Sequence, residues 1–463
     1  MRRVPDGRAP APRHETDGCV SGDAEARRRQ DRGAAAGRAG QAQVRPRVLR
    51  GDQAGRVRRR VALSQSFRGA RRGGSQDPRY GLPIHTRIGL LLLALASPLA
   101  AQEPNPKHNW VDHVYPFVYY SSADGFWLAG HYDWSSPIGF VERPEPSFGR
   151  IAFDVGASTQ GSHAFIVDAQ APAYWDGWRI GLTLSLTRAN RLGYFGQGNG
   201  TLYARDSTKG VGRSYFYRVS RRTDGARLTV QRKVTGPLRV LVGGTFEHTD
   251  FRQLPGESVF KRDRTAGLVD DSPFNDAVGR VGVVFDLRDL EVDPHRGVFA
   301  EALVGRGRGY TRTSASFHAY VHPLQRLVLA GRIGGERVTG TAPLAVQQTM
   351  ETSEGPVVAL GGFRSLRGYY DGRFVGPGKI VGGIEARYGI LWSPRLLELK
   401  LIAFYDAGRV FAPGEAVRLT RQGLHAAWGG GVALALLRNT LVLVEAGKGS
   451  EGAQVTFATA WTF

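Results

Sequence analysis

The sequence predicts an all-β protein, a transmembrane antiparallel β-barrel of about 16 strands. Three observations predict this fold class. Many segments of about ten residues alternate apolar and polar side chains, the period of a strand with one apolar and one polar face. The main apolar run has the length and position of an export signal. The segment from Ala453 to Phe463 also alternates and is aromatic at its end. A soluble protein rarely exposes such an edge, whereas a membrane barrel would pair it.

The apolar run at residues 88–101 is too short for a membrane-spanning helix, which needs about 20 residues. Arg87 precedes it and two alanines, Ala100 and Ala101, end it, as in a secretory signal peptide with a small-residue cleavage site. We therefore expect a signal peptide at residues 84–101, a short periplasmic segment at 102–113 and the barrel at 114–463. A buried core helix is the alternative interpretation of the apolar run.

Residues 1–83 form a basic leader with twenty arginines and eight acidic residues, a net charge of +12 out of +21 for the chain. Such a composition buries too little apolar surface to offset chain entropy, so we expect disorder. The leader is either an arm that binds nucleic acid or a stretch upstream of a mis-assigned start. We favour the second interpretation, because a signal peptide should begin near the amino terminus. We therefore expect no nucleic-acid partner.

The only cysteine, Cys19, lies in the leader. The rest of the chain therefore has no disulfide and no cysteine metal site, which suits passage through an oxidising periplasm. The sequence also lacks a phosphate-binding Walker loop, a His-Glu-x-x-His motif and a Gly-x-Ser-x-Gly nucleophile elbow. We expect neither an enzyme nor a bound cofactor or metal.

The clearest alternating segment runs from Trp178 to Thr187, and clusters of Gly, Pro, Asp and Asn separate it from its neighbours, as turns require. A spacing of about 22 residues over the predicted mature chain gives about 16 strands. Tryptophans near segment ends are expected in interfacial belts; they are Trp110, Trp127, Trp134, Trp178, Trp392 and Trp461. A soluble β-sandwich or propeller is the alternative. Two long irregular stretches, at 251–277 and 338–378, interrupt the pattern, and long loops are often functional.

The second stretch carries the most specific motif, Gly-Gly-Phe-Arg-Ser-Leu-Arg-Gly-Tyr at residues 361–369. It resembles the Arg-Gly-Phe/Tyr loop of the outer membrane protein 85 superfamily, in the bacterial surface antigen domain of its BamA/TamA-like branch. Other segments resemble the family in the same order: residues 194–199, 285–289, 293–297, 382–388, 404–408 and 461–463. The resemblance implies a barrel with a long extracellular loop folded into its lumen.

Strand periodicity places Phe404, Asp406 and Gly408 on one face of their strand, and Glu385 on the matching face of an earlier one. The resemblance implies that Arg367 of the loop meets Asp406 in the lumen, with Glu385 nearby. A guanidinium suits bidentate pairing with a carboxylate. The alternative is that these are separate solvated charges.

Two neighbours of the arginine complete the implied loop latch. Gly368 would let the backbone pass where a side chain could not fit, and Tyr369 would pack against the wall. The final segment, with Phe457, Trp461 and Phe463 on one strand face, resembles the β-signal read by the barrel assembly machinery. That machinery is therefore an expected partner during biogenesis.

The resemblance implies a Gram-negative outer-membrane protein, surrounded by lipid, that inserts or translocates outer-membrane or secreted client proteins. The implied mechanism opens a seam between the first strand, near residues 114–121, and the last, at 454–463, for β-augmentation by a client strand. Assembly members carry periplasmic POTRA domains, and about a dozen residues precede the first strand here, so we expect a separate POTRA-bearing protein or another task. The alternative function is a passive pore or structural surface antigen.

Overall fold

The computed structural model describes residues 109–121, 124–138, 143–358, 360–393, 396–436 and 440–463. The predicted leader, the signal peptide and most of the predicted periplasmic segment lie outside the described residues. The first strand begins at Val111, inside the segment that was predicted as periplasmic.

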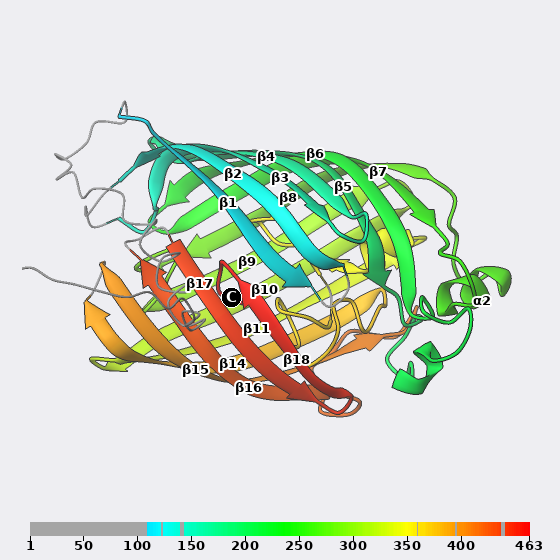
Figure 1. Cartoon of the computed structure of the whole chain (residues 1–463). Helices are drawn as coiled ribbons and strands as arrows, with labels where there is room; N and C mark the ends of the chain where they lie inside the picture. Colours follow the sequence, from blue (N-terminus) through cyan, green and yellow to red (C-terminus); the bar gives the residue numbers. More distant parts are fainter. Residues whose placement is uncertain (1–108, 122–123, 139–142, 359, 394–395, 437–439) are drawn as a thin grey trace, which may run out of the picture. The chain divides into compact units, whose positions relative to one another are not determined.

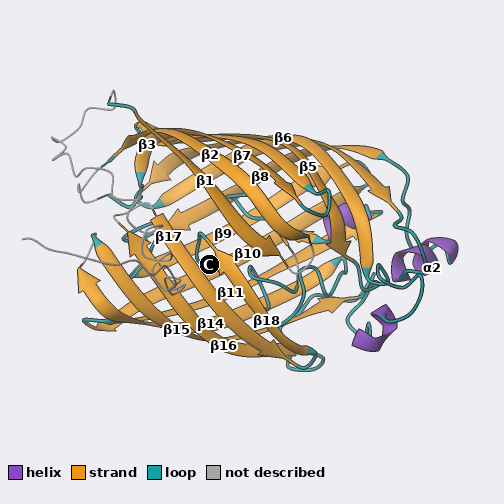
Figure 2. Ribbon diagram, in the orientation of Figure 1, coloured by secondary structure: helices purple, strands orange, loops and turns teal. Residues whose placement is uncertain are grey.

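Sixteen strands of the described residues form one antiparallel sheet, in which each strand pairs with the previous and the next strand of that sheet along the chain (Figures 1 and 2). This confirms the predicted all-β class and strand number. The strands are β1 (Val111–Ser121), β2 (Gly125–Pro137), β3 (Ser147–Ser158), β4 (His163–Trp175), β5 (Trp178–Gly193), β6 (Arg218–Thr235), β7 (Leu238–Arg252), β8 (Phe274–Asp286), β9 (Gly297–Gly307), β10 (Tyr310–Leu324), β11 (Leu327–Gly340), β14 (Gly378–Ser393), β15 (Leu397–Phe411), β16 (His425–Leu436), β17 (Thr440–Gly449) and β18 (Gly452–Ala458).

The sheet has an apolar outer face and a charged inner face. On β15, Lys400, Phe404 and Asp406 are buried, while Leu401 and Tyr405 between them are exposed. The backbone groups of the strands inside such a sheet find partners on the two adjacent strands, which a membrane demands of any segment that crosses it. Among the described residues, no helix has the length and apolar character needed to cross a membrane.

The sheet is not closed, which corrects the expectation of a fully paired barrel. β1 and β18 are the two ends of the strand order, and no pairing between them occurs among the described residues. In Figure 1 they border the same gap. We call this boundary the seam. Both seam strands present exposed apolar side chains, Val114 and Val118 on β1 and Val455 and Phe457 on β18.

The predicted last strand is also shorter than expected. β18 ends at Ala458, and residues 459–463, which we call the terminal segment, leave the sheet. Phe457 faces outward as predicted, but Trp461 and Phe463 are buried instead of sharing its strand face, so Trp461 belongs to no interfacial belt. The physical reason is that β18 has no partner on its open side, whereas the lumen offers the Trp461 indole N–H a carboxylate at Asp293.

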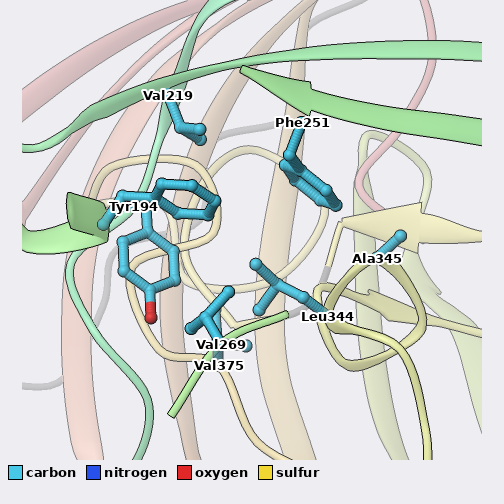
Figure 3. Close-up of a cluster of buried hydrophobic side chains, with 8 residues drawn as sticks. Tyr194, Val219, Phe251, Val269, Leu344, Ala345 and Val375 are labelled. Atoms are coloured by element: carbon cyan, nitrogen blue, oxygen red, sulfur yellow. The ribbon is translucent and has the colours of Figure 1, made fainter. Parts of the chain in front are cut away.

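One end of the sheet carries the long loops and the few helices, η1 (Arg205–Thr208), α2 (Val259–Thr265) and α3 (Leu344–Gln347), with the short pair β12 (Thr349–Met350) and β13 (Val357–Val358). Both predicted irregular stretches lie there. They meet in a buried apolar cluster, drawn in Figure 3, that joins Tyr194, Phe251 and Phe260 to Leu344 and Val375. This cluster ties the bases of the loops together.

Candidate functional site

The candidate site is centred on residues 341–377 between β11 and β14, which we call the lumen loop. Arg367 of this loop is 2% exposed. Its Nε and Nη2 donate to the two carboxylate oxygens of Asp406 at 2.8 and 3.0 Å, and its Nη1 donates to Glu445 at 2.9 Å and to Glu385. The guanidinium also lies 3.6 Å from the ring centroid of Phe404. One arginine therefore binds three strands, β14, β15 and β17, and we call this group the loop latch.

The backbone of the lumen loop passes directly against β17. A Cβ at Gly447 would lie 1.6 Å from the carbonyl oxygen of Arg367, and a Cβ at Gly368 would lie 2.6 Å from the nitrogen of Gly449. Tyr369 is buried, and its hydroxyl donates to the Ala426 carbonyl at 3.2 Å. Glycine is therefore required on both surfaces of this contact, because any side chain would separate loop and wall.

Gly408 and Tyr369 border a second close contact of the loop. A Cβ at Gly408 would lie 2.8 Å from Leu360 of the lumen loop. Leu360 and Tyr369 share a buried cluster with Leu366 and Phe374. The structure thus brings together all the residues that the sequence predicted for the latch and its strand partners.

A second anchor holds the lumen loop to another part of the wall. This anchor is the acidic Glu351, whereas the loop latch uses the basic Arg367. Glu351 accepts hydrogen bonds from Arg227 on β6 at 2.6 Å and from Arg280 on β8 at 2.8 Å. Arg312 on β10 lies 3.5 Å from its other carboxylate oxygen. The Glu351 backbone N–H donates to Glu336 on β11 at 2.8 Å. The loop therefore spans the lumen between two sets of strands.

The end opposite the long loops holds a compact charged cluster of Asp293, His295, Glu398 and Lys400. One ligand atom from each of Asp293, His295 and Glu398 lies within 4.8 Å of the others, the geometry of a small cation site. The Lys400 ammonium already lies among them, bonded to Asp293 and 2.9 Å from Glu398. The four groups balance in charge without a metal ion, so we assign none here.

His295 lies in the turn between β8 and β9, and its protonation completes that balance. Burial lowers the pKa of His295, but hydrogen bonds to Asp293 and Glu398 outweigh burial and raise the pKa to about 9. The imidazole is therefore charged at neutral pH. Asp293 also accepts the indole N–H of Trp461 at 2.9 Å, which links the cluster to the terminal segment.

The model of the Omp85 superfamily domain matches residues 150–439. The chain belongs to the Omp85 superfamily. This membership places it among outer-membrane β-barrel proteins that serve protein insertion or secretion. The comparison with curated proteins gave no match.

Among solved structures, this Omp85 chain is similar to BamA from Haemophilus ducreyi lacking POTRA domains 1–3, with 13% identity and a TM-score of 0.48 over 75% of this chain and 69% of that one. It is also similar to CdiB from Escherichia coli, with 12% identity and a TM-score of 0.47 over 75% of this chain and 61% of that one. For CdiB from Acinetobacter baumannii the identity is 13% and the TM-score 0.41, over 75% and 58%. The chain thus spans less than two thirds of the length of the two CdiB structures.

Sequence reasoning missed several residues of the site in this Omp85 chain. Glu445 lies on the same face of β17 as Gly447, and its strand alternation alone could have placed it in the lumen. Glu351 lies in an irregular stretch where no periodicity predicts a direction. Arg332 and Arg387 alternate correctly for the inner face, but nothing in the sequence indicates that they contact the terminal segment.

Proposed function

We propose that this protein inserts other β-barrel chains into the outer membrane by opening its seam to a strand of the client. The observation that carries the proposal is the unpaired boundary between β1 and β18. Two strand edges with free backbone donors and acceptors are a template for a further strand. On the lipid face, the exposed apolar side chains of both strands would lie beside those of the client strand and form one continuous apolar surface.

The lumen contents favour insertion through the wall over passage through the pore. The lumen loop is fixed to two parts of the wall by Arg367 and Glu351, and the terminal segment fills the opposite end. A polypeptide moving along the axis would have to break both charged anchors, and removing a partner from a buried ion pair costs about 3–5 kcal/mol. Moving β1 from β18 breaks no strand pairing among the described residues.

The topology sets the orientation that the proposal requires. β1 starts and β18 ends at the same end of the sheet, which would face the periplasm, and the lumen loop would then enter the lumen from the outer-surface end. Clients would reach the seam from the periplasm, delivered by a separate POTRA-bearing protein. The loop latch and its strand partners would hold the wall beside the seam rigid.

The test locks the seam reversibly with a disulfide bond between β1 and β18. Cys19→Ser removes the chain's only cysteine, and Val114→Cys or Val118→Cys is then combined with Val455→Cys or Phe457→Cys. The oxidised protein in liposomes should fold an added small outer-membrane barrel, diluted from urea, no faster than empty liposomes do. Reduction should restore folding. Val167→Cys with Leu184→Cys, paired on β4 and β5 away from the seam, is the matched control lock.

The passive pore is the alternative that this experiment separates. If the protein is a pore, oxidised and reduced forms will fold the added barrel equally slowly and will show the same steady single-channel conductance. Deleting residues 361–376 should then raise the conductance. If insertion activity persists in protein that is shown to carry the seam disulfide, the proposed mechanism is wrong.

A further inference from the structure

A groove of about 340 Å³ lies on the outer, lipid-facing side of the sheet, nearer the end that carries the long loops. Its floor is formed by Ala315 of β10 and Gly335 of β11, which pair directly and place no large side chain above the sheet. Phe317 and Ile333 border it toward the opposite end. Its remaining border is the loop between β15 and β16, residues 412–424. We call this site the wall groove.

The loop between β15 and β16 folds down onto the outer face of the sheet. A Cβ at Gly378 would lie 2.7 Å from the side chain of Val417. By strand alternation Ile380 and Phe411 face outward, yet they are only 7% and 0% exposed. Ile384, on the same face of β14 as Ile380, is 65% exposed. The loop therefore covers part of the wall and builds a border on a surface that is elsewhere an open apolar sheet.

Arg409, on the outer face of β15, holds this loop in place. Its Nη2 donates to the Glu415 carboxylate at 2.9 Å, and its Nη1 donates to the Gln422 carbonyl at 3.0 Å. Glu415 is the only carboxylate among residues 412–424. Because Arg409 neutralises it, the loop keeps two uncompensated positive charges, on Arg418 and Arg421.

Two exposed arginines lie at the wall groove. Arg418 lines it directly. Arg337 follows Gly335 by two residues on the same face of β11, and it pairs in register with Gly378, the residue that Val417 covers. Within the described part of the chain, neither guanidinium forms an ion pair or a hydrogen bond. The groove thus combines an apolar floor with two cations that have no anion.

We propose that the wall groove binds a lipid that carries a phosphate monoester, with an acyl chain on the apolar floor and the phosphate at Arg337 and Arg418. The groove opens on the lipid-facing surface, so its occupant comes from the bilayer. A guanidinium donates two parallel hydrogen bonds to phosphate. A phosphate monoester carries a charge of about −1.5 to −2 at neutral pH, which two guanidiniums balance, whereas a phosphodiester carries a single charge.

The orientation described above assigns the groove to the outer leaflet of the membrane. Basic groups near a membrane surface attract anionic headgroups, and basic pockets on the wall of a membrane protein can select them. The exposed Leu419, next to Arg418 in the loop, adds apolar surface at the same border. Lipid binding here requires no opening of the seam, so the inference is independent of the proposed function.

A second groove on the outer face lacks these charges. It has a volume of about 480 Å³ and is lined by Ala226, Gly244 and Gly279 of β6, β7 and β8. Arg227, which also borders it, is paired with Glu351 of the lumen loop. This groove can accept an acyl chain of any lipid but offers no free cation to a headgroup, and it therefore provides the matched control.

The test uses native mass spectrometry to count lipids bound to the full-length protein in micelles of a non-ionic detergent. The probe is diphosphoryl lipid A, which carries two phosphate monoesters. The comparison lipid is phosphatidylethanolamine, whose phosphodiester is balanced by its own ammonium. The wild type should bind lipid A saturably and at least about tenfold more tightly than the comparison lipid, because charge-assisted hydrogen bonds form only with the former. Inorganic phosphate, which lacks an acyl chain, should not displace lipid A.

Two kinds of variant should weaken the binding of lipid A. Arg337→Gln combined with Arg418→Gln removes the cations and should lower the affinity at least about tenfold. Ala315→Phe fills the floor of the groove and should lower it as well. The controls are Arg222→Gln, an exposed outer-face arginine that is already in an ion pair, and Ala226→Phe in the second groove. Both controls should keep the wild-type affinity. Equal affinities in all these proteins overturn the proposal.

A second measurement uses the wild type alone and so does not depend on the folding of any variant. Phenylglyoxal modifies exposed arginines, and the modified positions are identified by peptide mass. Lipid A should slow the modification of Arg337 and Arg418 and leave that of Arg222 unchanged, and the comparison lipid should protect none of them. Equal protection of Arg222, or equal protection by the two lipids, would show general coverage by lipid and contradict a specific site.

Discussion

Arg367 of the lumen loop forms a bidentate ion pair with Asp406 of β15, with donor–acceptor distances of 2.8 and 3.0 Å. Two further carboxylates, Glu385 and Glu445, contact the same guanidinium, so the latch holds more negative than positive charge. Arg387, at 2.6 Å from Glu385, compensates part of the excess. The buried latch is therefore part of a connected charge network that extends through Arg387 to the terminal segment, and removing any one charged group leaves its neighbours with unbalanced charge.

Replacing the latch arginine should weaken the barrel strongly. Arg367→Ala leaves three buried carboxylates without their shared partner, which should cost about 3–5 kcal/mol. We expect the temperature at which the folded band converts to the unfolded band on a gel to fall clearly. Arg418→Ala, on an exposed loop, is the control and should leave this temperature unchanged. Equal conversion temperatures for the two variants would argue against a latch.

The second anchor should fix the other half of the lumen loop. Glu351→Gln leaves Arg227 and Arg280 without their carboxylate, which should cost about 1–3 kcal/mol. Because both anchors hold one loop, we expect their effects on loop release to be non-additive. Trypsin should cut at Arg364 or Arg373 rapidly in the double variant Glu351→Gln and Arg367→Ala, and slowly in each single variant. Additive cutting rates would show that the two anchors act independently.

The contact between the loop backbone and β17 should tolerate no side chain. Gly447→Ala would place a Cβ 1.6 Å from the Arg367 carbonyl oxygen, so the loop must move away from the wall. We expect this single methyl group to lower the conversion temperature about as much as loss of Arg367 does. Gly279→Ala on β8, where a Cβ meets nothing within 4 Å, is the matched control. A fully stable Gly447→Ala protein would contradict the loop's position.

Because of the charged cluster around His295, the stability of the fold should decrease at alkaline pH. The pKa of His295 is raised from 6.5 to about 9 in the folded state, so protonation stabilises the fold. That contribution is complete below pH 6.5 and is lost as the pH rises through 9. The conversion temperature of the wild type should therefore fall between pH 7 and pH 10, and that of His295→Gln should fall less. Parallel pH profiles would mean that His295 is not charged in the fold.

The strand framework was predictable from the sequence because membrane strands obey a simple period. The alternation around Trp178 and around Asp406 predicts both the strands and their inner faces, and β5 and β15 follow it. Placing Arg367 beside Asp406 needed more than periodicity, because the loop has no period. The motif around Arg367 supplied that information through its resemblance to a family, and the structure brings these residues together.

The position of the terminal segment was not predictable, since residues 453–463 alternate with one face mostly large and apolar and read as strand up to Phe463. Alternation reports which side a residue would face if paired, and it does not report whether a partner strand exists. Among the described residues β18 has no partner on one side, and Trp461 gains a hydrogen bond to Asp293 and a cation–π contact with Arg387 in the lumen instead. Those partners lie far away in the sequence, so no local pattern indicates them.

Amide hydrogen exchange of the full-length protein in lipid nanodiscs tests the open seam most directly. Within the described part of the chain, strands β1 and β18 each pair on one side only, so every second amide along them should exchange rapidly, while the amides of β14 and β15, paired on both sides, should stay protected. Uniform slow exchange along β1 and β18, equal to that of β14 and β15, would show a closed barrel and contradict the account.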